Sequence, residues 1–135
     1  MCATEPGGML VFVPPRCLIV DDNLRFLEAA RALLERDGVD VVGIASSPDA
    51  ALSQVAALRP EIVLVDIDLG GESGFELARS LAGVDGSRVI LVSTYSEADF
   101  AELIAASPAI GFIPKSELSA DAIRELAGLQ VGEHR

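Results

Sequence analysis

Short runs of apolar, mostly β-branched residues alternate along the chain with amphipathic segments that carry helix-start signals. The clearest run is Ile62–Val65, which leads into Asp66 and then at once into a glycine-rich turn. Four consecutive apolar residues are typical of a strand buried on both faces of a parallel sheet. The same pattern predicts five strands, at residues 17–20, 39–45, 62–65, 88–92 and 110–113.

Helices are predicted between and after these strands. Ser47 with Pro48 is typical of one helix start, and Ser73 with Glu76 has the spacing of a capping box. The five predicted helices cover residues 23–37, 48–59, 73–81, 96–107 and 119–129. Strands that alternate with helices through short turns call for a parallel sheet covered on both faces. We therefore expect an α/β fold, a flavodoxin-like doubly wound (βα)5 domain with strand order 2-1-3-4-5.

Composition and charge narrow the classes of function. A chain of 135 residues is long enough for one domain, and a net charge of −11 disfavours direct binding to nucleic acid or to anionic membranes. Cys2 and Cys17 do not make a disulfide framework, and Cys17 is interpreted as a core residue. With no apolar stretch of about 20 residues and no basic leader, the expected location is cytoplasmic. Residues 1–15 are expected to be a flexible extension, 16–130 the domain and 131–135 a tail.

Polar residues interrupt the apolar pattern at the carboxyl ends of the predicted strands. Asp21 and Asp22 follow the first strand, Asp66 the third, Ser93 the fourth and Lys115 the fifth. In the expected strand order, the first and third strands are neighbours, so Asp22 and Asp66 should face each other. Crowded carboxylates need a counter-charge, and Mg²⁺ suits oxygen ligands beside a phosphate site. The alternative for Asp21 and Asp22 is that they cap the first helix.

With these residues in this order, the sequence resembles the receiver domains of two-component response regulators, over residues 16–129. The resemblance rests on the segments LIVDDN, IVLVDIDLGGESGFEL, VILVSTYSE and GFIPKSEL. It implies that Asp66 accepts a phosphoryl group from a histidine kinase or a histidine phosphotransfer protein. It also implies that Mg²⁺ binds to Asp21, Asp22, Asp66 and the backbone carbonyl of Asp68.

The resemblance implies further roles for residues around Asp66. Lys115 would pair with the phosphate, and Ser93 would move to form a hydrogen bond with it. Phe112 stands at the position of the family's switch aromatic, although a plain core role fits it equally. Asp68 and Tyr95 occupy positions that tune the lifetime of the phosphorylated state. The output would be a changed surface on the fourth helix, fifth strand and fifth helix, read by a downstream protein or by a second copy in a homodimer.

Gly70 departs from the family's pattern, because a proline is common at this position. We expect the loop after Asp66 to be more mobile for that reason.

Two other functions stay open. DIDLG resembles the nucleophile motif of haloacid-dehalogenase phosphatases, which also use Mg²⁺, but that family places its acid pair after its lysine and not before it. A receiver-like adaptor that works without phosphorylation would share the fold, whereas the complete set of site residues favours a phosphoacceptor. We therefore expect a stand-alone receiver that catalyses its own phosphorylation and dephosphorylation, a signalling switch and not a turnover enzyme.

Overall fold

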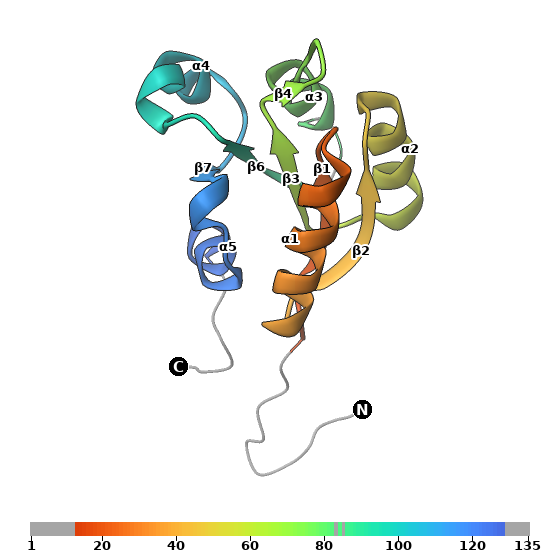
Figure 1. The fold of residues 1–135 in the computed structure, drawn as a ribbon. Coiled ribbons are helices and arrows are strands. Elements are labelled where there is room, and N and C mark those ends of the chain that lie inside the picture. The colour runs from red at the N-terminus through yellow and green to blue at the C-terminus, as the bar shows by residue number, and fades with distance from the viewer. Residues whose placement is uncertain (1–12, 83, 85, 129–135) are drawn as a thin grey trace.

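The computed structural model describes residues 13–82, 84 and 86–128. Its centre is a parallel five-stranded sheet of order β2-β1-β3-β6-β7 (Figure 1), which confirms the predicted order. All five residues of β3 are buried, as its continuous apolar run indicated. In the order of the chain, the five strands are Arg16–Val20 (β1), Asp40–Ala45 (β2), Ile62–Asp66 (β3), Arg88–Ser93 (β6) and Gly111–Pro114 (β7).

Helices cover both faces of the sheet. α1 (Leu24–Arg36) and α5 (Ala120–Ala127) pack on one face, with Leu27, Leu34 and Ile123 in a shared apolar cluster. Figure 1 shows these two helices on the same side of the strands. A second cluster on the other face includes residues of α2 and α3, with Ile104 of α4 packed against it. These three helices are Pro48–Leu58 (α2), Gly74–Leu81 (α3) and Ala101–Ala106 (α4).

Side-chain caps begin three of these helices as their sequences indicated. The hydroxyl oxygens of Ser47, Ser73 and Ser119 each accept a hydrogen bond from a backbone N–H in the first turn of their helix. At α1 the cap is Asn23, whose side chain accepts from the N–H of Phe26 at 3.1 Å. The alternative in which Asp21 or Asp22 caps α1 is therefore wrong.

The segment 96–107 is not the single helix that the sequence indicated. It forms a 3-10 turn, Glu97–Phe100, followed by the short helix α4. Ser96 makes no side-chain cap, and none of the residues of either piece is fully buried. A segment with weak capping and little buried surface has few interactions to hold a long regular helix.

The loop after β3 contains structure that the sequence analysis missed. Asp68–Leu69 (β4) pairs antiparallel with Glu72–Ser73 (β5), and Gly70 and Gly71 form the turn between them. Both glycines have positive φ angles, +65° and +98°. Two-residue hairpin turns of this kind require positive φ at both central positions, which glycine adopts without strain.

Cys17 lies fully buried in β1, which confirms its interpretation as a core residue. Burial raises the pKa of its thiol to about 12, although a contact with the backbone of Leu64 opposes the shift.

The expectations for Cys2 and for both chain ends concern residues that lie mostly outside the described part. Within that part, no helix has the length and apolar character needed to span a bilayer.

We expect Gly74→Ala to destabilise the protein, because α3 begins directly against the end of β3. A β-carbon at Gly74 would overlap the carbonyl oxygen of Asp66 and lie 2.7 Å from Cα of Ile67. Without that contact, alanine in the helix would stabilise it by about 0.5–1 kcal/mol. The overlap should instead lower the free energy of unfolding by about 2 kcal/mol, measured by urea denaturation. A variant as stable as the wild type would contradict this tight packing.

Candidate functional site

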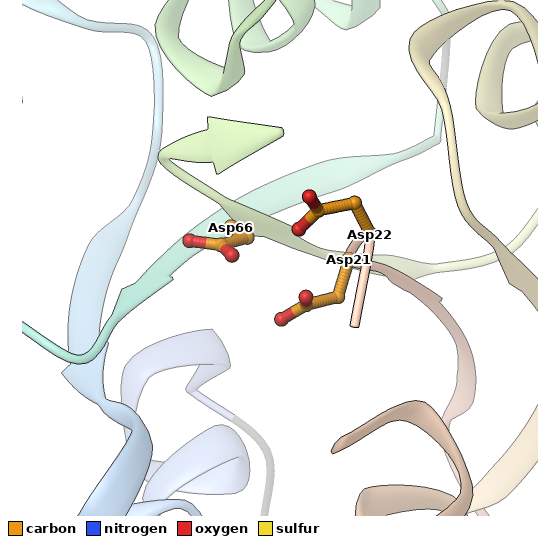
Figure 2. A group of neighbouring side chains, drawn as sticks. All are labelled: Asp21, Asp22 and Asp66. Atoms are coloured by element: carbon orange, nitrogen blue, oxygen red, sulfur yellow. The ribbon is translucent and has the colours of Figure 1, made fainter. Parts of the chain in front are cut away.

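Three aspartates meet at the carboxyl edge of the sheet. Asp21 follows β1 directly and Asp66 is the last residue of β3, and these two strands pair in parallel. One carboxylate oxygen from each of Asp21, Asp22 and Asp66 lies within 4.8 Å of the others. Figure 2 shows the three side chains next to one another at the ends of the two strands. The expected approach of Asp22 and Asp66 is therefore present, because the sheet order makes their strands neighbours.

Lys115 reaches this group from the end of β7, beyond the intervening strand β6. Its Nζ lies 2.5 Å from Oδ2 of Asp21 and 3.1 Å from Oδ2 of Asp66. The Asp21 side chain is fully buried, and the Lys115 side chain is only 13% exposed. Pro114 ends β7 and a 3-10 turn begins at Lys115, so the backbone directs this side chain toward the acids. Of the residues expected to line the site, Asp21 and Asp66 make direct contact with Lys115.

Phe26 is a site neighbour that the sequence analysis missed. The ammonium group of Lys115 lies 4.4 Å from the centroid of the Phe26 ring. An ammonium group over an aromatic face is attracted by the negative face of the ring. Phe26 belongs to α1, whereas Lys115 directly follows β7, so the contact joins residues that lie far apart in the chain. No local pattern in the sequence indicates this contact.

Backbone N–H groups hold two of the three carboxylates. Asn23 donates to Oδ1 of Asp21 at 2.8 Å, and Asp68 donates to Oδ1 of Asp66 at 3.2 Å. Asp21 and Asp66 therefore each have one oxygen facing Lys115 and the other facing a backbone donor. Asp22 differs, because its exposed carboxylate has no hydrogen bond or ion pair to any residue that the structure describes.

The charges of the site do not balance. Three carboxylates and one ammonium group would leave two excess negative charges if all were ionised. Burial raises the pKa of Asp66 to about 6, and the charge of Asp21 adds to the rise, while the Asp68 N–H and Lys115 oppose it. Burial lowers the pKa of Lys115, but Asp21 and Asp66 raise it by more, so it lies above its ordinary value. Excess negative charge on clustered oxygen donors fits a hard divalent cation such as Mg²⁺.

The other residues expected at the site lie around this group. Ser93 is the buried last residue of β6, and its Oγ accepts a hydrogen bond from the N–H of Tyr95 at 3.0 Å. The Tyr95 side chain is exposed and packs edge-on against Phe100. Phe112 is buried in β7, within the cluster on the face of α2 and α3. Asp68 is exposed in the hairpin. The roles given to these residues stay predictions.

Comparison with known proteins assigns the chain to one family. The chain matches the family model of the response regulator receiver domain over residues 17–127. A relative from Myxococcus xanthus, a protein-glutamate methylesterase/protein-glutamine glutaminase, is 31% identical over 131 residues, which cover 94% of this chain and 38% of the relative. The chain spans about a third to a half of the length of the curated relatives that it matches.

Solved structures of similar proteins share the fold. The signal receiver domain of the response regulator NarL from Mycobacterium tuberculosis is 27% identical, with a TM-score of 0.76 over 87% of this chain and 98% of that one. A response regulator from Burkholderia pseudomallei is 29% identical, with a TM-score of 0.72 over 86% of this chain and 66% of that one. The second structure contains a phosphorylated aspartic acid, a calcium ion and citrate.

The burial of Asp21 makes the stability of the site depend on Lys115. We expect Lys115→Met to lower the free energy of unfolding by about 3 kcal/mol in metal-free buffer, because it leaves buried carboxylates without their ammonium partner. Adding Asp21→Asn to this variant should recover much of the loss. Denaturation in urea with a chelator present measures both changes.

Arg36→Met is the matched control, because Arg36 pairs with Asp37 on the surface, where the two side chains are 71% and 44% exposed. Its loss should stay within about 0.5 kcal/mol. An equal loss of free energy of unfolding in Lys115→Met and Arg36→Met would show that the buried contacts of Lys115 do not stabilise the protein more than a surface ion pair.

Proposed function

The chain belongs to the response regulator receiver family, and from this premise we propose that Asp66 accepts a phosphoryl group from a histidine kinase or a histidine phosphotransfer protein. The observation that carries the proposal is the placement of Asp66 between Lys115 and two further carboxylates at the carboxyl edge of the sheet. The phosphorylated aspartic acid in the Burkholderia pseudomallei relative supports it.

The proposed reaction is an in-line displacement at phosphorus. A carboxylate oxygen of Asp66 forms a new bond to phosphorus, while the bond from phosphorus to the imidazole nitrogen of the donor breaks and its electron pair stays on that nitrogen. Lys115 already lies 3.1 Å from Asp66 Oδ2, where its charge would stabilise the oxygens of the transferred group. Attack of water on phosphorus would then break the bond to the Asp66 oxygen, release inorganic phosphate and return Asp66 to its carboxylate form.

Asp21, Asp22 and Asp66 would hold Mg²⁺, together with the backbone carbonyl of Asp68. The cation would neutralise charge on the phosphoryl oxygens during transfer. The clustered oxygens and the excess negative charge of the site fit such an ion. The carboxylate of Asp21, buried beside Lys115, and the exposed carboxylate of Asp22 would contribute from the end of β1.

The proposed output is a change of surface. Ser93 would form a hydrogen bond with the new phosphate and Phe112 would follow it inward, which would alter the face formed by α4, β7 and α5. Asp68 and Tyr95 would set the lifetime of the acyl phosphate. A downstream protein, or a second copy of the chain in a homodimer, would bind the altered face.

We propose residues 16–130 as the receiver domain, with an extension at 1–15 and a tail at 131–135. In this proposal the protein acts as a stand-alone switch that docks on its target or passes the phosphoryl group onward. It works in the cytoplasm, where a kinase can supply the phosphoryl group. Its phosphorylation and dephosphorylation are self-catalysed, and it is not a turnover enzyme.

Incubation with acetyl phosphate and Mg²⁺ should add one phosphoryl group to the wild type, detected by intact-protein mass spectrometry. Asp66→Asn should abolish the addition, because the amide lacks the nucleophilic carboxylate. Asp40→Asn is the matched control, because its carboxylate is exposed at the opposite end of the sheet. It should still be phosphorylated.

Phosphorylation of the Asp66→Asn protein would refute the site. A wild type that is never phosphorylated, by acetyl phosphate or by a histidine kinase, would favour the adaptor. Continuous hydrolysis of phosphomonoesters would instead favour the phosphatase.

Mg²⁺ should stabilise the protein against heat, because it binds the folded site. At a concentration ten times its Kd, the gain in free energy of unfolding is about 1.4 kcal/mol. Asp22→Asn should remove most of the gain, whereas Asp40→Asn should keep it, since Asp40 is exposed at the opposite end of the sheet. Thermal unfolding with and without Mg²⁺ measures the difference. An equal response of both variants would place the ion elsewhere.

A further inference from the structure

The turn of the β4–β5 hairpin lies against the site. Gly70 and Gly71 follow each other in this turn and both have positive φ angles. Their surroundings differ. A β-carbon at Gly70 would lie 2.8 Å from Oδ2 of Asp22 and 3.6 Å from its Cγ, whereas a β-carbon at Gly71 would meet no atom within 4 Å. The carboxylate of Asp22 therefore occupies the space that a side chain at Gly70 would need.

Asp22 is the carboxylate of the site that is held least by polar contacts. Lys115 and backbone N–H groups fix Asp21 and Asp66. No hydrogen bond or ion pair to Asp22 occurs among the residues that the structure describes. Within the described part of the chain, no polar contact therefore holds this carboxylate, and the space beside Gly70 accommodates it.

We propose that Gly70 is a positioning residue for the cation site: its missing side chain leaves the space that Asp22 uses when it faces Asp21 and Asp66. The proposal rests on the proposed Mg²⁺ site. With the turn at its observed positive φ, a β-carbon at Gly70 displaces the Asp22 carboxylate, because this carboxylate is the free end of a short side chain and yields more easily than the turn. The displacement weakens cation binding and leaves the contacts of Lys115 in place.

The adjacent glycines provide the test. Gly70→Ala and Gly71→Ala both place alanine at a positive φ, so both carry backbone strain, and both should lower the melting temperature in chelator. Only Gly70→Ala should weaken Mg²⁺ binding, by about tenfold or more, as for other residues that orient a metal ligand. Gly71→Ala should stay within about twofold of the wild type. Isothermal titration of the metal-free proteins with MgCl₂ measures these affinities.

Two further measurements separate positioning from damage to the fold. In an Asp22→Ala background, Gly70→Ala should cause no additional loss of Mg²⁺ affinity, because the carboxylate that it would displace is already absent. The Mg²⁺ concentration for half-maximal phosphorylation by acetyl phosphate should rise about as much as Kd does. Should the alanine variants fold poorly, Gly70→Asn and Gly71→Asn repeat the comparison, since asparagine tolerates positive φ better.

The outcomes distinguish this inference from the proposed function. If the wild type binds Mg²⁺ and Gly70→Ala binds it equally well, Gly70 does not position Asp22 and the site itself stands. If both alanine variants lose affinity equally, strain in the turn is the cause and the inference is overturned. If the wild type binds no Mg²⁺, the proposed site fails, and the inference fails with it.

Discussion

The site depends on the compensation of buried negative charge by the ammonium group of Lys115. Asp21 is completely buried and Asp66 nearly so, and each directs one oxygen at Lys115. Carboxylates in such positions are costly unless a counter-charge and hydrogen bonds accompany them. Lys115 compensates only part of the negative charge, because Asp21 and Asp66 both contact it and Asp22 lies beside them. The remaining negative charge is what suits the group to a divalent cation.

The sheet order brings these charged residues together. β1 and β3 are direct neighbours, so the residues at their carboxyl ends come together although 45 positions separate Asp21 from Asp66 in the chain. Helices on both faces close the sheet, and the apolar strands leave their carboxyl ends as the natural place for polar groups. Lys115 reaches the same place from β7, past β6.

The three carboxylates are held by different means. Polar contacts fix Asp21 and Asp66, whereas Asp22 lies in the space that the missing side chain of Gly70 leaves. The ring of Phe26 adds a cation–π contact to the ammonium group of Lys115. A carboxylate with no internal partner can give its oxygens to a cation without losing a hydrogen bond. The site thus combines two carboxylates held by polar contacts with one, Asp22, that has none within the described part of the chain.

The sequence by itself determined the strands, the sheet order and the chain positions of the acids and Lys115, because these depend on apolar periodicity and on capping residues. It predicted one helix over the segment 96–107, where weak capping and burial leave a 3-10 turn followed by the shorter α4. The tertiary structure alone decided the contact of Phe26 with Lys115, the hairpin after β3 and the approach of Gly70 to Asp22. These features join residues from separate elements or depend on backbone angles and side-chain positions, and no local pattern in the sequence encodes such distances.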